Sequence, residues 1–186
     1  MSRMPSVEQV RPGRCAGCGV ASRPTGHGLG LHGHGLRVRE MLGPHVAQGE
    51  PATVSVPCRR YLCVDCDAVM LVVPGAILAR RRYSASAIAQ ALALFGLERM
   101  SPAKVRRWTS PFRIVGATAA GDWVTIDRWC DDVRVGRLFS EVRRCPDTFS
   151  RRQVAERAAT TIGSRAPPPG DASLTVRAFA GGARAG

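Results

Sequence analysis

Two Cys-x-x-Cys pairs are the feature that most constrains how this chain can fold. Cys15 and Cys18 form the first pair, and Cys63 and Cys66 form the second. A two-residue gap lets both sulfur atoms of a pair reach one metal ion from a tight turn, and two such turns complete a tetrahedron. The sequence therefore predicts one Zn²⁺ site with four cysteine ligands: Cys15, Cys18, Cys63 and Cys66.

Other uses of these cysteines are a disulfide framework and a redox dithiol. The chain has seven cysteines, an odd number, and residues 1–14 contain no apolar run that would serve as a secretory signal. Both observations favour metal ligands over disulfides. A glycine-histidine tract at residues 25–35 offers a further alternative, a Cys₃His site, although a flexible loop with solvated histidines fits the tract as well. Its candidate ligands are His27, His32 and His34.

Three short strands are expected around the cysteine pairs, at residues 36–42, 53–62 and 67–73. In the first, Leu36, Val38 and Leu42 alternate with other residues, which predicts a half-buried strand. Pro57 interrupts the second and predicts an edge or a bulge at that point. Cys58, next to it, has no cysteine at pair spacing and is expected to be a buried thiol. Three antiparallel strands that end in cysteine turns would make a zinc ribbon.

The pattern becomes helical after residue 83. Ser84 and Ser101 are expected N-caps of two helices, the second with Pro102 at its first position, and Gly96 is placed to end the first helix. A third helix is expected near residues 123–133, with Trp123 and Trp129 as core or interface anchors, and a fourth after a capping box that begins at residue 150. Residues 164–186, rich in Gly, Ala and Pro, predict a disordered tail.

Net charge is the main pointer to a partner. The formal charge is +13, which favours a polyanion such as double-stranded DNA. Of the 27 Lys and Arg residues only Lys104 is lysine, a bias typical of GC-rich codons, so the choice of arginine is not itself evidence of base reading. The longest apolar stretch is too short to span a bilayer, so we expect a cytoplasmic protein.

The two helices after residue 83 have the length and spacing of a helix-turn-helix. Val105 and Trp108 are expected to face inward on the second helix, which leaves its basic residues outward. A plain helical hairpin with a solvated basic face is the alternative, but residues 80–113 hold eight basic residues and only one acidic residue, Glu98. The DNA-contacting candidates are Arg80, Arg81, Arg82, Lys104, Arg106 and Arg107.

Several of these motifs together resemble the N-terminal region of bacterial insertion-sequence transposases. They are the Cys15-x-x-Cys18-Gly19 turn, the His32-Gly33-His34-Gly35 segment and the Arg59-Arg60-Tyr61-x-Cys63-x-x-Cys66 approach. The resemblance covers residues 13–112 and implies a zinc ribbon followed by a helix-turn-helix that grips the transposon end. It also implies that the four paired cysteines hold the zinc.

A complete transposase also carries a three-carboxylate nuclease domain, and here the chain departs from the family. The acidic residues after the helices fall on helical sequence, and Asp122 and Asp132 are expected to solvate helix faces. We therefore expect a non-catalytic DNA-binding protein that could act with a transposase or another protein. A zinc-ribbon adaptor that binds protein, a transcription regulator and an RNA-binding protein are alternatives. The sequence does not indicate an oligomeric state.

The expected architecture is α+β, a small antiparallel zinc ribbon followed by an all-α region. Its parts are a flexible leader (1–14), a zinc ribbon with a Gly/His insertion (15–75), a helix-turn-helix region (80–163) and a disordered tail (164–186).

Overall fold

The computed structural model describes residues 4–114, 122–167 and 171–185. Within these ranges the chain is α+β, as the sequence predicts, with one three-stranded sheet and five helices, one helix more than expected. It divides into two compact units. We call residues 1–40 and 55–74 the cysteine unit, and residues 41–54 and 75–186 the helical unit.

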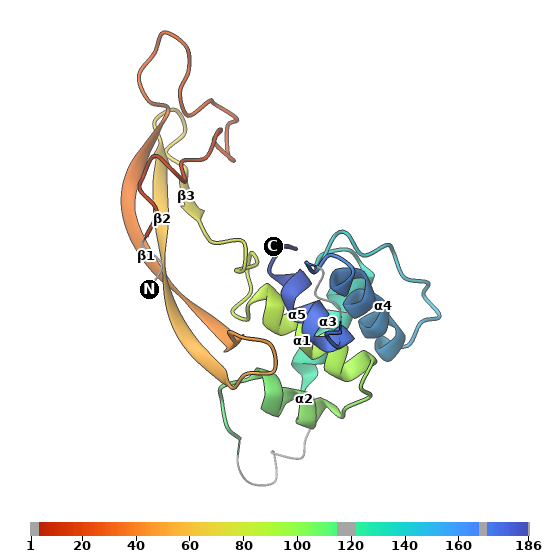
Figure 1. The fold of residues 1–186 in the computed structure, drawn as a ribbon. Helices are drawn as coiled ribbons and strands as arrows, with labels where there is room; N and C mark the ends of the chain where they lie inside the picture. Colours follow the sequence, from red (N-terminus) through yellow and green to blue (C-terminus); the bar gives the residue numbers. More distant parts are fainter. Residues whose placement is uncertain (1–3, 115–121, 168–170, 186) are drawn as a thin grey trace. The chain divides into compact units, whose positions relative to one another are not determined.

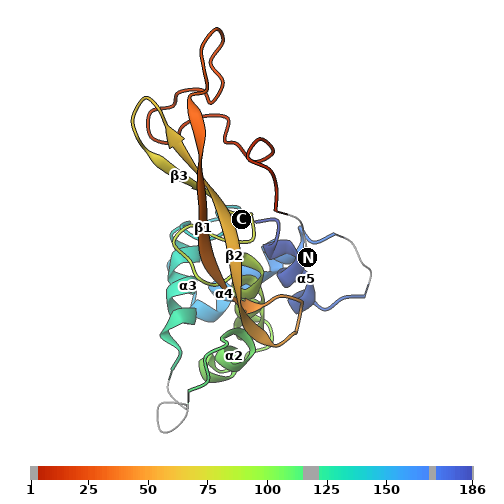
Figure 2. The same cartoon turned by 90° about the vertical axis from the view of Figure 1, so that its left-hand side faces the viewer.

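The sheet has the strand order β1-β2-β3, with β2 in the middle (Figure 1 and Figure 2). β2 and β3 are antiparallel, with Arg59 opposite Val72 and Leu62 opposite Val69. The three strands lie where the alternating segments predict them, although the first begins earlier than expected. Their bounds are Leu31–Pro44 for β1, Pro51–Cys63 for β2 and Val69–Val72 for β3.

The start of β1 corrects two expectations. Residues 31–35 of the glycine-histidine tract are strand rather than loop. Leu36 and Val38, expected on a half-buried face, are 51% and 62% exposed, whereas Leu42 is buried. Alternation identifies the two sides of a pleated strand, but it does not show whether a second layer covers either of them.

Pro57 lies within β2, before the stretch that pairs with β3. One edge of β2 therefore has no β3 partner at this point, which suits a residue without an N–H donor and agrees with the expected edge position. Cys58 is buried as predicted, and burial raises the pKa of its thiol. Its Sγ lies 3.5 Å from the carbonyl oxygen of Val56.

Residues 1–14 were expected to form a flexible leader, and this prediction is wrong for residues 5–11. Residues 1–3 lie outside the described part of the chain. The Tyr61 hydroxyl donates a hydrogen bond to the Val7 carbonyl, and the Arg59 side chain donates one to the Pro5 carbonyl, at 2.7 Å. The buried Arg11 guanidinium donates to the Leu31 carbonyl. These long-range bonds tie the segment to the sheet, although its sequence has no periodicity.

The helical unit contains the five helices. Ser84, Ser101 and Ser150 each accept a hydrogen bond from a backbone N–H in the first helical turn, so all three predicted N-caps are confirmed. The capping box at Ser150 is complete, since Gln153 bonds back to the cap backbone. The helices are α1 (Ala85–Gly96), α2 (Pro102–Thr109), α3 (Val124–Arg134), α4 (Arg151–Gly163) and α5 (Leu174–Gly182).

Helix α5 shows that the disordered tail expected at residues 164–186 is wrong for residues 174–182. It packs against both α1 and α4, which also pack against each other (Figure 1). The contact uses small residues: Ala178 is fully buried, and Gly181 and Gly182 are buried beside it. Small side chains let helix backbones approach closely, and the buried residues of α5 are all small, so α5 carries no stripe of buried large apolar residues that would reveal the contact in a sequence.

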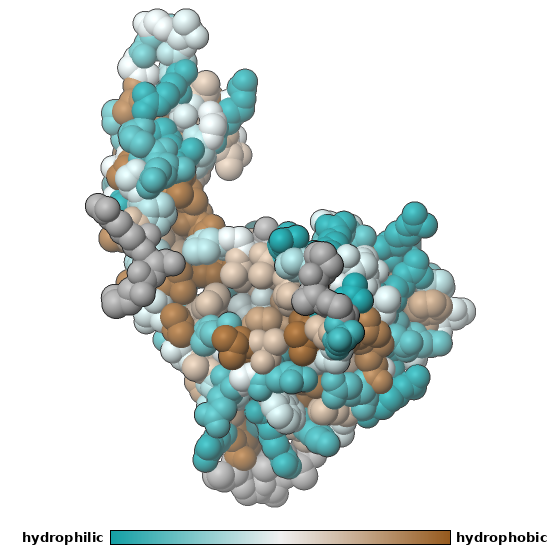
Figure 3. All heavy atoms as spheres, in the orientation of Figure 1, coloured by the Kyte–Doolittle hydropathy of each residue, from teal (hydrophilic) through white to brown (hydrophobic). Residues whose placement is uncertain are grey.

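The core of the helical unit includes the predicted aromatic anchors. Trp123 and Trp129 are 8% and 3% exposed, and Tyr83 contacts both rings edge-on, with centroid distances of 6.0 and 5.2 Å. Ile88 and Leu92 of α1 are fully buried in the same core. The face drawn in Figure 3 carries hydrophilic residues with smaller apolar patches between them.

Candidate metal centre and the basic helix

The first cysteine turn has a specific backbone arrangement. The Cys15 carbonyl accepts a hydrogen bond from the Gly19 N–H at 2.9 Å, and the Cys15 N–H donates one to the Val20 carbonyl at 2.8 Å. Gly19 has φ of +78°, a left-handed conformation that glycine adopts without a steric penalty. The turn therefore directs the Cys15 and Cys18 side chains to one side.

The second cysteine turn repeats this arrangement. The Cys63 carbonyl accepts from the Asp67 N–H at 3.1 Å, and the Cys63 N–H donates to the Ala68 carbonyl at 3.0 Å. Asp67, which corresponds to Gly19, is also left-handed, with φ of +56°. Two segments far apart in sequence thus form the same turn, the arrangement that a shared metal ion requires of paired cysteines.

The sulfur atoms of the two turns converge. All four Sγ atoms lie within 4.8 Å of one another. Cys15 and Cys66 are 3.7 Å apart, and Cys18 and Cys63 are 3.6 Å apart. A tetrahedron with metal–sulfur bonds of about 2.3 Å has edges of about 3.8 Å, whereas a disulfide needs about 2.05 Å. The spacing fits four ligands of one metal ion and does not fit disulfides.

The surroundings of the sulfurs hold them in place. Cys15 and Cys63 are buried beside Leu31 of β1, while Cys18 and Cys66 are exposed. The Gly17 N–H lies 3.3 Å from the Cys15 sulfur, a bond that favours the thiolate. One side of the cluster is thus fixed in a small core, and the other is open to an entering ion.

Hydrogen bonds and crowding change the thiol pKa values in opposite directions. The backbone N–H groups of Cys18 and Gly17 lower the pKa of Cys15 to about 6. The Ala68 N–H lowers the pKa of Cys66, but the neighbouring Cys18 and Cys63 sulfurs outweigh it and raise that pKa to about 12. Thiolates repel one another at this distance, and a bound cation would remove the repulsion.

The histidine alternative gains no support in the described part of the chain. His27, His32 and His34 are all exposed, and the cluster that could hold a metal ion there consists of cysteines alone. The solvated reading of these histidines therefore describes their positions better than a Cys₃His site.

The six candidate DNA-contacting residues all lie in the helical unit. Arg80 and Arg82 are exposed, but Arg81 is partly buried and forms an ion pair with Asp132. On α2, Lys104 and Arg107 are exposed and Arg106 is partly buried. Contacts of Arg81 with a DNA phosphate would therefore compete with an ion pair inside the protein.

The buried side of helix α2 differs from the one that the sequence predicts. Val105 is fully buried as predicted, but its inward partner is Thr109, and Trp108 is 41% exposed. Both spacings, three and four residues, return to the same side of a helix, so the sequence pattern alone does not choose between them. The outward face of α2 consequently carries Lys104, Arg107 and the Trp108 indole.

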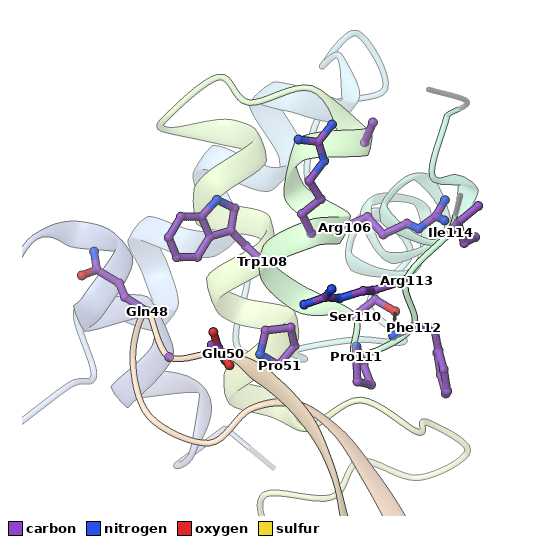
Figure 4. A pocket seen from close by; sticks show the side chains of 13 residues that line it. Gln48, Glu50, Pro51, Arg106, Trp108, Ser110, Pro111, Phe112, Arg113 and Ile114 are labelled. Atoms are coloured by element: carbon purple, nitrogen blue, oxygen red, sulfur yellow. Dashed lines mark hydrogen bonds between the residues drawn. The ribbon is translucent and has the colours of Figure 1, made fainter. Parts of the chain in front are cut away.

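Trp108 lines a groove of about 590 Å³ between α2, the segment after it and the turn that joins β1 to β2. Figure 4 shows Trp108 projecting from α2 toward the turn that carries Gln48 and Glu50. This groove was not predicted from the sequence, although aromatic residues interleaved with arginines at residues 106–113 are a signal that could have revealed it. The lining residues are Gln48, Gly49, Glu50, Pro51, Ala103, Arg106, Arg107, Trp108, Ser110, Pro111, Phe112, Arg113 and Ile114.

Carboxylates between residues 122 and 141 serve largely as partners of arginines. Asp127 and Asp131 both pair with Arg151, each at 3.1 Å. The expectation that Asp132 solvates a helix face is wrong, because it is buried between Arg81 and Arg137. A buried carboxylate needs such cationic partners, and a helical sequence pattern cannot reveal them when they lie elsewhere in the chain. Asp122 is exposed as predicted, but it precedes α3 rather than lying on a helix face.

Comparison with models of known protein families, with curated proteins and with solved structures finds no match to this chain. The resemblance to transposases stays a prediction from the motifs. Across the described residues, no helix has both the length and the apolar character needed to cross a membrane.

Proposed function

We propose that this chain is a non-catalytic, zinc-dependent DNA-binding protein, similar in role to the DNA-end-binding part of a transposase. The exposed basic face of α2 carries the proposal, since Lys104 and Arg107 project from a capped helix that packs on α1. The formal charge of +13 supports a polyanionic partner. Phosphates would be contacted by the arginines before α1, and base edges by α2.

Zinc is the proposed metal because four converging thiolates suit it in both softness and geometry. The cysteine unit has a small core of Cys15, Leu31 and Cys63, so metal binding would supply much of its folding free energy. Each of the two turns would contribute two ligands.

Metal analysis of the purified chain tests the zinc assignment. We expect about one zinc per chain, lost in Cys63→Ser and retained in Cys58→Ser, a control in the same strand outside the cluster. Iron in place of zinc would be visible as charge-transfer absorption. A chain that holds no metal and unfolds identically with and without a chelator would contradict the assignment.

Binding to DNA is tested by selection from random-sequence duplexes, followed by affinity measurements over a range of salt concentrations. Arg107→Ala should weaken binding to the selected site by about 1–3 kcal/mol and relax specificity if Arg107 contacts a base. Arg106→Ala should have a similar effect if Arg106 reads the site as well. Arg128→Ala, an exposed charge change of the same size on α3, is the control and should leave specificity unchanged.

Phosphate contacts have a different signature. Arg80→Ala and Arg82→Ala should weaken binding about equally on all sequences and reduce the salt slope by roughly one unit each. Should an Arg106/Arg107 double variant bind its best duplex unchanged, the basic face is merely solvated and a protein-binding adaptor becomes the better description. Tighter binding to RNA than to any DNA would instead favour the RNA alternative.

A further inference from the structure

We propose that the groove between α2 and the β1–β2 turn binds an unpaired nucleotide of the DNA partner. The base would stack on Trp108, and its phosphates would lie between Arg106 and Arg113. This inference rests on the proposed DNA-binding function and adds a preference for DNA that has an unpaired end or a junction.

Trp108 is the first observation. The chain has three tryptophans, and Trp123 and Trp129 are buried in the helical core. Trp108 is 41% exposed and lies at a groove instead. A large aromatic ring left open to solvent beside a concave surface is a common mark of a binding site. Its indole offers a flat apolar surface that any base can stack on.

The second observation is that the groove has well-anchored walls. The Leu42 N–H donates to the Arg82 carbonyl at 2.8 Å, and the Ser84 N–H donates to the Leu42 carbonyl at 3.1 Å. The Gln48 N–H donates to the Gln90 side chain of α1 at 2.9 Å. These bonds hold the turn against the helices, so the groove opposite Trp108 exists before any ligand binds.

Gly43 lets the end of β1 lie directly against α1. Gly43 has φ of +114°, and an added Cβ would lie 2.3 Å from the Cβ of Ala87. On the other wall, the Ser110 hydroxyl accepts a hydrogen bond from the Phe112 N–H, and the Arg82 guanidinium lies 5.9 Å from the centre of the Phe112 ring. Both sides are thus fixed by contacts within the helical unit.

Charge identifies the class of ligand. The lining contains Arg106, Arg107 and Arg113 against a single carboxylate, Glu50. Figure 4 shows Arg106 on α2 and Arg113 on the segment that follows it, both among the residues that line the groove. A cationic groove with an aromatic ring and the polar amide of Gln48 matches the phosphate, face and edge of a nucleotide.

An unpaired base fits this arrangement better than a paired one. In the interior of a duplex both faces of a base are covered by its neighbours in the stack, so an indole cannot lie against them. An overhang or an extruded base exposes a face. The volume of about 590 Å³ lies in the range of small-molecule sites, of about 300–1,000 Å³, and accommodates a nucleotide.

The test compares a blunt duplex with the same duplex carrying a short thymidine overhang. Wild-type protein should bind the overhang DNA about tenfold more tightly, and Trp108→Leu should bring the ratio of overhang to blunt-duplex affinity close to one. Trp108→Phe should retain part of it, because phenylalanine also stacks. Glu50→Gln should strengthen overhang binding several-fold, because it removes the one negative charge in the lining.

Fluorescence gives an independent readout. Addition of oligothymidylate should quench the emission of the wild-type protein and leave that of Trp108→Phe unchanged, since the other two tryptophans are buried. Equal affinity for blunt and overhang DNA, or an equal loss on both in Trp108→Leu, would overturn the inference and leave the proposed function standing. Absence of binding to every DNA would overturn both. Quenching by polyglutamate but not by oligothymidylate would overturn the inference in favour of an acidic protein partner.

Discussion

Gly181 of α5 lies so close to α4 that a single added methyl group would collide with the α4 backbone. A Cβ at this position would lie 2.0 Å from the Ile162 carbonyl oxygen and 2.8 Å from the Ile162 carbonyl carbon. Neither atom is the end of a flexible side chain, so the collision cannot be relieved by a rotamer change. Gly181→Ala is therefore expected to push α5 away from α4.

The magnitude follows from the size of this displacement. Restoring an ordinary contact of 3.4 Å requires a shift of about 1.4 Å. A gap of about 0.5–1 Å already loses a quarter to a half of a dispersion contact, and overpacking costs about 1–3 kcal/mol. Alanine regains at most about 1 kcal/mol through its higher helix propensity. We expect Gly181→Ala to lower the free energy of unfolding of the helical unit by about 1–2 kcal/mol.

Gly163→Ala, at the end of α4 in the same interface, is the matched control. Its nearest atom would be the Ala178 backbone nitrogen at 3.4 Å, an ordinary contact, so propensity should prevail and stability should rise by up to about 1 kcal/mol. Urea unfolding followed by far-ultraviolet circular dichroism and by the emission of the buried Trp123 and Trp129 measures both changes. If Gly181→Ala matches wild type, α5 is not docked and the disordered tail expected from the sequence is the better description.

Removing a glycine from the first cysteine turn and introducing one into the second should have opposite effects on stability. Gly19→Ala should destabilise the metal-bound cysteine unit by about 1–2 kcal/mol, and Asp67→Gly should be neutral or stabilising, because both positions are left-handed; competition with a chromogenic zinc chelator measures both. Burial raises the pKa of Asp132, but bonds from Arg137 and Arg81 outweigh it and leave that pKa below its ordinary value. Stability from this carboxylate is therefore present above its unfolded pKa of about 3.9 and is lost as the pH falls through the lower folded value. Asp132→Asn should lower stability by about 2 kcal/mol at pH 7 and flatten the loss below pH 4 in acid-unfolding curves; an unchanged curve would show that the ion pairs add nothing.

Features set by neighbouring residues could be predicted from the sequence. The N-caps at Ser84, Ser101 and Ser150 depend on a side chain and a backbone N–H within one turn. The shape of each cysteine turn follows from the spacing within its pair. In all of these cases the residues that determine the structure are only a few positions apart.

Features set by packing between distant segments could not be predicted. Trp108 was expected inside because it is apolar and three residues from Val105, but the packing of α2 buries Thr109 instead and leaves Trp108 41% exposed. The small residues of α5 give no apolar stripe, so its docking on α1 and α4 has no signature in the sequence. The prediction for Leu36 and Val38 was wrong for a different reason. Their alternation suggested that one face of the strand is buried, but both side chains are exposed.

The arrangement around α1 has a consequence for the order in which the helical unit can fold during synthesis. All twelve residues of α1 are buried, and none of them is charged. Two of the helices that cover α1, α4 and α5, leave the ribosome well after it does. Until then the nascent chain displays an uncovered apolar helix, the kind of surface that chaperones bind and that nucleates aggregation. A slow translation step between α3 and α5 would prolong that exposure without changing a single residue of the finished protein.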